Sequence, residues 1–504
     1  MNRPWSVFGQ HPPGLRVCFV VELWERFSFY GLRSLFIFYL TQHLLFPVKD
    51  AYLIYGTYAA MVYMAPVVGG FLADQYLGAR KAVTLGAVLV TLGHFTLAFE
   101  SPAATTVITG SGAMVVRDQV YLTFFFISLA AIVMGVSFVK TSCATLVGAL
   151  YGPNDPRRDS GFTLYYMSIN IGGAAAPILC GWVANAYGFG YGFGVAGIGM
   201  LIGLYAFRRG QKHLQGLSEP PVTAKLEAVA FAGVTREWAI YALAFALIVV
   251  VAIVLRNPGT VGFLIGAVGA GMAAVVLYYA FFRCDKAARG RLLACGILLL
   301  FTIGFWAFYE QMGTSLAIFA DRYVDRRVLG YAVPASMLQS LPAAFVLVLA
   351  PLLSSLWLAL ARRGREPSTA SKFAVATLFL ALGFLVLALG IHLADANTRI
   401  SIGWVVLNFL LLVVGELCLA PMSQSMVTKL APRPIMGLMV GCLLLSTSAS
   451  IYISSLIAQF TAGSGSTGYA ALYSRLGLTA LCVCLVLLLI RPLLKRLTQE
   501  APAT

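Results

Sequence analysis

Long apolar runs alternate with short polar segments along the whole chain. A helix needs about 20 apolar residues to cross a bilayer, so each run predicts one membrane-spanning helix. The runs are continuous and do not alternate at period two, which argues against the strands of a membrane barrel. The predicted spans, about fourteen in all, are residues 15–45, 51–76, 80–99, 120–148, 160–187, 190–208, 238–256, 259–283, 292–321, 331–360, 371–393, 400–430, 434–461 and 470–492.

The composition supports this membrane assignment. Of 504 residues, 60% are hydrophobic and only 11% are charged, whereas a soluble domain carries about 25% charged residues. No cleavable signal is expected, because the first 14 residues contain three prolines and lead directly into the first apolar run. The nine cysteines form no CxxC pair and are interpreted as small buried hydrophobic residues. The sequence therefore predicts an all-α polytopic membrane protein.

The chain has a formal net charge of +16, and the distribution of its basic residues predicts how it is oriented in the membrane. Taken alone, such a charge also fits a nucleic-acid partner, but the basic residues lie in short loops beside the spans, so no nucleic-acid partner is expected. They cluster in every second loop, and by the positive-inside rule both termini are predicted to be cytoplasmic. The clusters are at 80–81, 157–158, 208–225, 283–291, 362–372, 429–433 and 495–496.

Two spans near the middle of the chain differ from the others. Residues 238–256 and 259–283 contain no internal charge and are joined by a tight turn, so we interpret them as an accessory hairpin. Six spans precede them and six follow. The predicted domains are a six-helix bundle at 1–208, a cytoplasmic linker with the hairpin at 209–290, and a second six-helix bundle at 291–504.

A weak internal repeat relates the two halves. Pro66 precedes Arg80 by the same spacing that separates Pro351 from Arg365. Two six-helix halves with a binding site between them are the plan of a major-facilitator transporter. We therefore expect a major-facilitator fold with an added two-helix hairpin.

The first predicted span carries an unusual set of charges: Glu22, Glu25, Arg26 and Arg33. A charge at the bilayer centre costs about 2.5–3.5 kcal/mol, and such residues usually mark a transport path. At about 100° per residue, positions 22, 26, 29, 30 and 33 fall on one arc, with Glu25 beside it. The alternative is that the charges only neutralise one another, as Glu22 and Arg26 can at i,i+4 spacing.

Three further charges lie singly within apolar spans: Lys140, Glu310 and Glu416. Cations thus concentrate in the first half and single acids in the second, an asymmetry that suits a zwitterionic ligand. Isolated carboxyl groups in apolar surroundings are also candidate proton carriers. The structural alternatives are a snorkelling lysine and static buried ion pairs.

Several segments resemble the proton-dependent oligopeptide transporter family, in its prokaryotic form. Residues 22–31 (ELWERFSFYG) resemble its ExxERFxYYG signature, and residues 165–172 (YYMSINIG) resemble its FYxxINxG motif. Residues 69–78 and 415–421 resemble motifs of two further spans. The resemblance covers nearly the whole chain, and the central hairpin is typical of prokaryotic members.

The resemblance implies roles for individual residues. For proton coupling it implies Glu22, Glu25, Arg26, Arg33 and Glu310. For substrate binding it implies Arg26, Tyr30, Arg33, Lys140, Asn170, Trp306, Glu310 and Glu416. Within the second set, Arg26, Tyr30 and Lys140 match positions that bind a peptide carboxylate. Asn170 and Glu416 match positions that hold the amino group. Arg33 with Glu310, and Lys140 with Glu416, match pairs that bridge the halves, and Trp306 matches a pocket aromatic residue.

The chain departs from the family pattern at several positions. Phe29 replaces a tyrosine of the first signature, Thr141 and Ser142 follow the lysine in place of Pro-Asn, and Gly56 stands where animal members carry histidine. Pro342 falls in a segment that lacks an expected asparagine, and Met439 in one that lacks an expected Trp-Phe pair. The change at Met439 predicts a differently shaped substrate pocket, and the absence of the histidine implies that any proton relay relies on glutamates.

The resemblance implies a proton-coupled symporter that imports di- and tripeptides by alternating access. An alternative keeps the fold with another small solute, such as an amino acid, nitrate or another anion. A third interpretation, an intramembrane enzyme or receptor, has no support, because no GxSxG elbow, Walker loop or metal-ligand cluster is present. We expect no cofactor or metal, a lipid bilayer and protons as partners, a monomer, and a location in the bacterial inner membrane.

Overall fold

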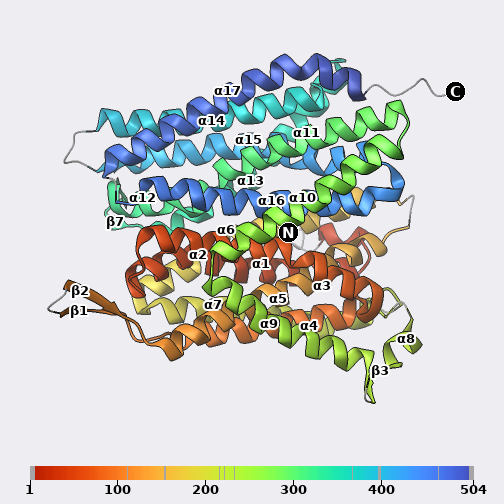
Figure 1. Ribbon diagram of the computed structural model, residues 1–504, viewed down its shortest axis with the longest axis horizontal. Coiled ribbons are helices and arrows are strands. Elements are labelled where there is room, and N and C mark those ends of the chain that lie inside the picture. Colours follow the sequence, from red (N-terminus) through yellow and green to blue (C-terminus); the bar gives the residue numbers. More distant parts are fainter. Residues whose placement is uncertain are drawn as a thin grey trace. The chain divides into compact units, whose positions relative to one another are not determined.

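The computed structural model describes residues 6–109, 112–152, 155–214, 216–220, 222–231, 233–365, 367–394, 399–463 and 465–498 (Figure 1). The chain divides into two compact units. The first comprises Met1–Pro47, Met61–Asn257 and Ser336–Ala344, and the second comprises Val48–Ala60, Pro258–Ala335 and Phe345–Thr504. The division predicted from sequence at 208 and 290 stays a prediction. The chain ends 1–5 and 499–504, predicted to be cytoplasmic, lie outside the described residues.

Helices form most of the first unit. They are α1 (Gly14–Phe38), α3 (Pro66–Leu72), α4 (Gly78–Ala98), α5 (Gln119–Ala149), α6 (Arg158–Tyr187), α7 (Phe189–Gly210), α8 (Thr223–Glu227) and α9 (Arg236–Arg256). Two five-residue π-helical segments, Tyr39–His43 and Ala73–Leu77, follow α1 and α3.

Helices also form most of the second unit. They are α10 (Gly259–Phe282), α11 (Lys286–Tyr309), α12 (Ser315–Tyr323), α13 (Leu341–Arg362), α14 (Thr369–Leu393), α15 (Ile402–Leu430), α16 (Met436–Ala458) and α17 (Ser466–Thr498). Most of α2 (Val48–Met64) belongs here as well: Ser448 on α16 donates a hydrogen bond of 2.9 Å to the carbonyl of Ala60.

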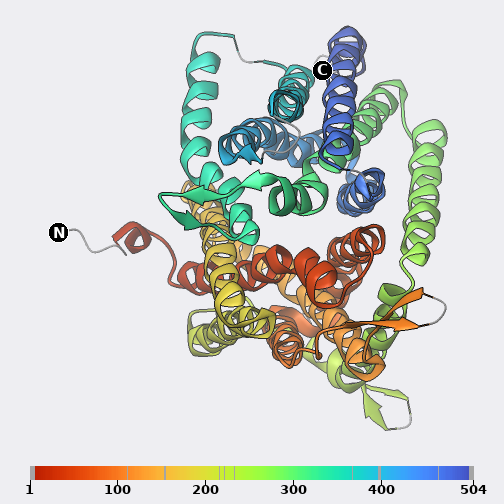
Figure 2. The same cartoon turned by 90° about the vertical axis from the view of Figure 1, so that its left-hand side faces the viewer.

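Strands occur only as four short pairs among the described residues. Three are antiparallel: β1 (Thr105–Thr109) with β2 (Gly112–Val116), β3 (Val229–Phe231) with β4 (Val234–Thr235), and β6 (Arg327–Val328) with β7 (Tyr331–Ala332). The fourth, β5 (Val324–Asp325) with β8 (Ile400–Ser401), is parallel. The β1–β2 hairpin projects beyond the helix ends of the first unit in Figure 1, and Figure 2, which faces that side, shows it in front of the helices.

Twelve helical stretches of the described chain are long and apolar enough to cross a membrane. Val48–Ala98 counts as one of them although it covers two predicted spans, and α1, with its charged residues, is not one of the twelve. The predicted all-α membrane architecture is therefore confirmed, whereas the predicted total of about fourteen spans is not.

The two helices of the predicted hairpin pack on different partners. α9 packs on α5, where Arg256 donates a hydrogen bond of 3.2 Å to Gln119. α10 packs on α16 and α11, and the Tyr452 hydroxyl of α16 donates to the carbonyl of Pro258 at 3.2 Å. Each helix is thus part of the unit on which it packs.

Glycines allow the helices of the first unit to approach closely. A methyl group on Gly135 of α5 would lie 2.6 Å from the carbonyl oxygen of Gly86 on α4. On α6, a methyl group on Gly172 would lie 2.4 Å from the carbonyl oxygen of Leu23 on α1. Small residues at such crossings are typical of membrane helix packing. The second contact places α6 against the charged part of α1.

The predicted span 292–321 is interrupted in the structure. α11 ends at Tyr309, residues Glu310–Gly313 form a short 3-10 turn, and α12 begins at Ser315. Gln311 fixes this turn by donating to the backbone carbonyl of Ser454 on α16 at 2.9 Å. The Ser315 hydroxyl in turn donates to the Gln311 side chain at 2.6 Å. Glu310 therefore lies at a helix break rather than on a regular helix.

Candidate functional site

Three charged side chains of α1 form a buried cluster in the first unit. Glu22, Glu25 and Arg26 are 2%, 0% and 4% exposed. The guanidinium of Arg26 donates to both carboxylate oxygens of Glu25, through Nη2 at 2.7 Å and through Nε. The same Nε lies 3.3 Å from Oε1 of Glu22. The local pairing left open as an alternative is therefore present, and one cation serves two carboxylates.

Tyr165 of α6 completes this cluster. Its hydroxyl donates to Oε2 of Glu22 at 2.6 Å, and the residue is buried. The close approach at Gly172 places α6 near enough for this bond. Tyr165 and Gly172 both belong to the YYMSINIG segment, which therefore packs against the ELWERFSFYG segment of α1. Tyr165 lies in a recognised motif but was not predicted from the sequence to be a site residue.

Aromatic rings lie beside the cations of α1. The Cζ atom of Arg26 is 5.2 Å from the ring centroid of Phe29, and that of Arg33 is 6.0 Å from the ring of Tyr30. A cation at these distances is attracted by the electron-rich face of the ring. Phe29, which departs from the family signature, is therefore a buried neighbour of Arg26.

Lys140 and Asn170 lie in the same unit. The Nζ atom of Lys140 on α5 is 3.8 Å from the ring centroid of Tyr63, and the residue is half-buried. The charges of Arg26, Glu25 and Glu22 all act on this ammonium group, Arg26 by repulsion and the two carboxylates by attraction. Asn170 donates to the backbone carbonyl of Tyr166 at 3.1 Å. Tyr63 was not identified from the sequence, because a tyrosine at the end of an apolar helix carries no specific signal.

A second polar group lies in the second unit. The hydroxyl of Tyr309 on α11 donates to Oε2 of Glu416 on α15. Glu416 is half-buried. The ring of Trp306 packs edge-on against Tyr309, with centroids 5.0 Å apart. Trp306 and Glu416 are thus connected through Tyr309. Glu310, the next residue, is 6% exposed at the helix break.

The residues at which the chain departs from the family pattern lie in different parts of the structure. Met439 is buried and lines an apolar cavity of about 400 Å³ between α10, α11 and α16. Gln339, before Pro342, has a buried amide nitrogen without a hydrogen-bond partner among the described residues. Gly56 packs against Ser455, where a methyl group would lie 2.3 Å from Cβ, so a larger side chain does not fit.

The structure groups the predicted site residues into two sets. Glu22, Glu25, Arg26, Tyr30, Arg33, Lys140 and Asn170 belong to the first unit, and Trp306, Glu310 and Glu416 belong to the second. The predicted pairs Arg33–Glu310 and Lys140–Glu416 take one member from each unit, and both pairs stay predictions. Among the described residues, no group of three or more His, Cys, Asp or Glu could hold a metal ion.

Many apolar spanning helices with charges buried inside them define a polytopic membrane transporter. A cluster of carboxylates and cations buried among such helices commonly marks the path of a proton or an ionic ligand.

Comparisons with known proteins agree with this class. Residues 80–473 match the model of the POT family. The chain is 34% identical to the peptide transporter YePEPT of Yersinia enterocolitica, over 97% of this chain and 95% of that protein. It is 30% identical to dipeptide and tripeptide permease B of Edwardsiella piscicida, over 100% and 99%. A crystal structure of a peptide transporter POT variant in complex with alafosfalin matches with a TM-score of 0.83 and 31% identity, over 98% and 97%.

The chain therefore belongs to the POT family, a family of multi-pass membrane transporters that includes the peptide transporters matched above. The structural likeness confirms the major-facilitator fold predicted from the sequence.

Proposed function

We propose that this protein is a proton-coupled symporter that imports di- and tripeptides by alternating access. It acts as a monomer in the bacterial inner membrane, with both ends in the cytoplasm, and has no enzymatic activity. Family membership supports peptide transport. The restriction to di- and tripeptides has support from the similarity to a dipeptide and tripeptide permease.

The observation that carries the proposal is the buried cluster on α1. Two carboxylates, Glu22 and Glu25, share the single cation Arg26, which leaves one excess negative charge. Lys140, whose ammonium group interacts electrostatically with both, balances it. A peptide carboxylate that binds here adds a new negative charge, which a proton on one glutamate would compensate. Substrate and proton then strengthen each other's binding, which is the thermodynamic requirement for coupling.

We assign the substrate ends by charge. Arg26, Tyr30 and Lys140 bind the peptide carboxylate, because they offer two cations and a hydroxyl donor. Asn170 and Glu416 bind the amino group, and the Tyr309 hydroxyl orients the Glu416 carboxylate. Trp306, packed on Tyr309, borders the space for the substrate side chains.

Glu310 serves proton coupling together with Arg33. Its place at a helix break suits a role in conformational change, because short irregular segments are where spanning helices bend. The proton on Glu310 and the charge of Arg33 are stabilised differently in the inward-facing and outward-facing states. They therefore shift the balance between these two states.

The test uses purified protein in liposomes with labelled dialanine. We expect accumulation when the outside is acidic and little uptake without a gradient. Excess unlabelled dipeptide should compete, whereas nitrate or free alanine should not. Uptake that ignores the gradient would overturn proton coupling, and competition by nitrate alone would favour the anion carrier.

Substitution of Glu310 separates coupling from binding. Glu310→Gln should keep exchange of labelled for unlabelled dialanine across the membrane but lose accumulation driven by the proton gradient. Glu219→Gln is the matched control, because this carboxylate is partly exposed and pairs with Arg80 at 3.0 Å outside the proposed site. Normal accumulation by Glu310→Gln would refute its role in coupling.

A further inference from the structure

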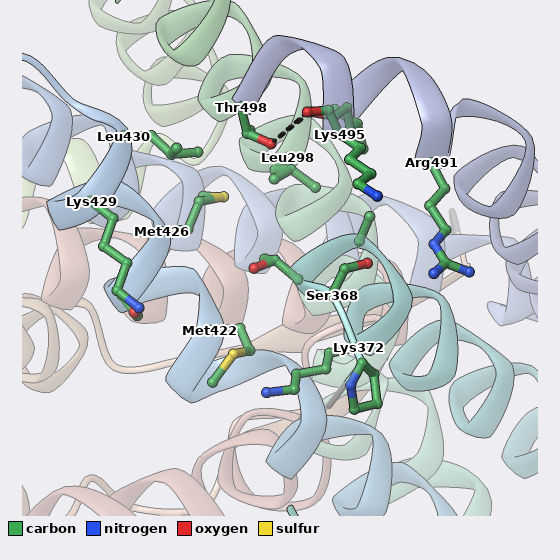
Figure 3. Close-up of a pocket in the computed structure, with 15 residues that line it drawn as sticks. Leu298, Ser368, Lys372, Met422, Met426, Lys429, Leu430, Arg491, Lys495 and Thr498 are labelled. Carbon is green, nitrogen blue, oxygen red and sulfur yellow. Dashed lines mark hydrogen bonds between the residues drawn. The ribbon is translucent and has the colours of Figure 1, made fainter. Parts of the chain in front are cut away.

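A basic cavity lies in the second unit, apart from the residues proposed for transport. Its volume is about 490 Å³, and it opens among the ends of α14, α15 and α17, with α11 at its base (Figure 3). Four cationic side chains line it: Lys372 of α14, Lys429 of α15, and Arg491 and Lys495 of α17. None of the described lining residues is acidic.

A basic recess in the first unit provides a contrast. It is lined by Arg80, Lys81 and Arg208, and its volume is about 550 Å³. There, however, Lys81 lies 2.5 Å from the carboxylate of Glu237, and Arg80 pairs with Glu219. The positive charge of that recess is largely balanced by neighbouring acids. The positive-inside rule accounts for basic loops in both units, but not for four cations around one cavity whose described lining contains no acid.

The remaining lining adds further groups that suit an oxyanion. Ser368 caps α14 and accepts a hydrogen bond from the amide of Ser371 at 3.3 Å. Ser368, the N-cap residue, and Thr369, the first residue of α14, both line the cavity. The amides of a helix N-terminus and its partial positive charge favour anions. In Figure 3 the guanidinium group of Arg491 and the ammonium group of Lys495 lie on the same side of the cavity as Ser368.

Lys372 is a buried cation of this cavity. It is only 5% exposed, and its Nζ atom lies 5.2 Å from the ring centroid of Trp357. A charge in such surroundings interacts strongly with an anion because water screens it poorly. Leu298, Met422, Met426 and Leu494 add apolar side chains to the lining. The cavity therefore combines cationic groups with a surface for hydrocarbon.

We propose that this cavity binds a phosphate-bearing anion, with the phosphate held by Lys372, Lys429, Arg491 and Lys495 at the N-terminus of α14. Two sources share this chemistry: the headgroup of an anionic phospholipid and a free phosphorylated solute. The basic loops predict that this end of the helices is cytoplasmic, the side on which basic pockets bind anionic headgroups. The proposal does not depend on peptide transport.

The variant that tests it removes three exposed cations of the cavity: Lys429→Gln, Arg491→Gln and Lys495→Gln together, with the buried Lys372 kept for folding. A matched control removes three exposed cations that do not line the cavity: Arg362→Gln, Arg363→Gln and Arg496→Gln. Both variants carry the same net charge, and Lys495 and Arg496 are neighbours on α17. If the cavity variant does not fold, Lys495→Gln against Arg496→Gln makes the same comparison.

Two probes distinguish the sources. Native mass spectrometry of delipidated protein measures binding of dioleoylphosphatidylglycerol against dioleoylphosphatidylcholine. Thermal unfolding measures stabilisation by inorganic phosphate against sodium chloride of equal ionic strength. Each cation near an anionic surface contributes about fivefold in affinity, so the cavity variant should bind about a hundredfold more weakly and the control little differently from wild type.

The outcomes are distinct. Selective retention of phosphatidylglycerol that is lost only in the cavity variant supports a lipid headgroup. Stabilisation by phosphate that is lost only in the cavity variant supports a soluble ligand. The proposal is overturned if neither probe prefers the wild type to the cavity variant, or if both triple variants weaken binding equally.

Discussion

The hydroxyl of Tyr165 holds the Glu22 carboxylate in place within a buried cluster that has two acids and one guanidinium. Tyr165→Phe removes one hydrogen bond to a charged group, which contributes about 1.5–3 kcal/mol. We expect a lower unfolding temperature and weaker dipeptide transport, because Glu22 then depends on Arg26 alone. Thermal unfolding and liposome uptake of dialanine measure the two effects.

Tyr187→Phe is the control for this substitution. Tyr187 lies on the same helix, is 64% exposed, and contacts the rings of Trp182 and Tyr191, which phenylalanine preserves. Its unfolding temperature should equal that of the wild type. Equal stability and equal uptake for Tyr165→Phe would show that the bond to Glu22 has no energetic role.

Part of this cluster was foreseen from the sequence as an alternative. The spacing of Glu22 and Arg26 left local pairing open, because residues four apart share a helix face, and the pair is present in the structure. The contact of Arg26 with Glu25 was not predictable from spacing, since adjacent residues point in different directions and only the long arginine side chain bridges them. Tyr165 and Tyr309 were missed as site residues because a tyrosine in an apolar helix usually indicates core packing.

The crossing of α4 and α5 depends on glycine. A methyl group on Gly135 would lie 2.6 Å from a backbone oxygen of α4 that cannot move alone. Overpacking of this kind costs about 1–3 kcal/mol. Gly135→Ala should therefore lower the unfolding temperature and the yield of folded protein from size-exclusion chromatography.

Gly148→Ala on the same helix gives the comparison. There the nearest atom to an added methyl group, on Phe162, is 3.7 Å away, an ordinary contact. Alanine is favoured over glycine inside a helix by about 0.5–1 kcal/mol, so this variant should be as stable as the wild type or more so. Similar losses in both variants would argue against close packing as the reason for Gly135.

Helix positions were easier to predict than helix interruptions. Apolar runs of spanning length identified the long helices, but the run 292–321 gave no sign of the break at Glu310–Gly313. A single glycine is a weak signal inside an apolar run, and the turn is held by Gln311 bonding to Ser454 on a distant helix. Tertiary hydrogen bonds of this kind are not encoded in local periodicity.

At the scale of the whole molecule, the charged residues of the candidate site divide unevenly between the two units. Arg26, Arg33 and Lys140 belong to the first unit together with Glu22 and Glu25, whereas Glu310 and Glu416 belong to the second. This distribution was visible in the sequence because charges are rare in apolar spans. The packing of α9 and α10 on different units was not, since both helices are uniformly apolar and their sequences do not indicate a partner.

If Lys140 of the first unit binds the substrate carboxylate and Glu416 of the second binds its amino group, two substitutions should have opposite effects on substrate analogues. Dialaninamide lacks the carboxylate and N-acetyl-dialanine lacks the ammonium group. Each should compete with labelled dialanine at least about tenfold more weakly than dialanine does, because a hydrogen bond to a charged group contributes about 1.5–3 kcal/mol.

Lys140→Gln should reduce the discrimination against the amide and leave that against the acetyl form unchanged, and Glu416→Gln should do the reverse. Lys212→Gln, an exposed loop cation, should change neither ratio. Loss of both discriminations in each variant would mean that the two charges do not read separate ends of the peptide, because independent contacts give additive effects.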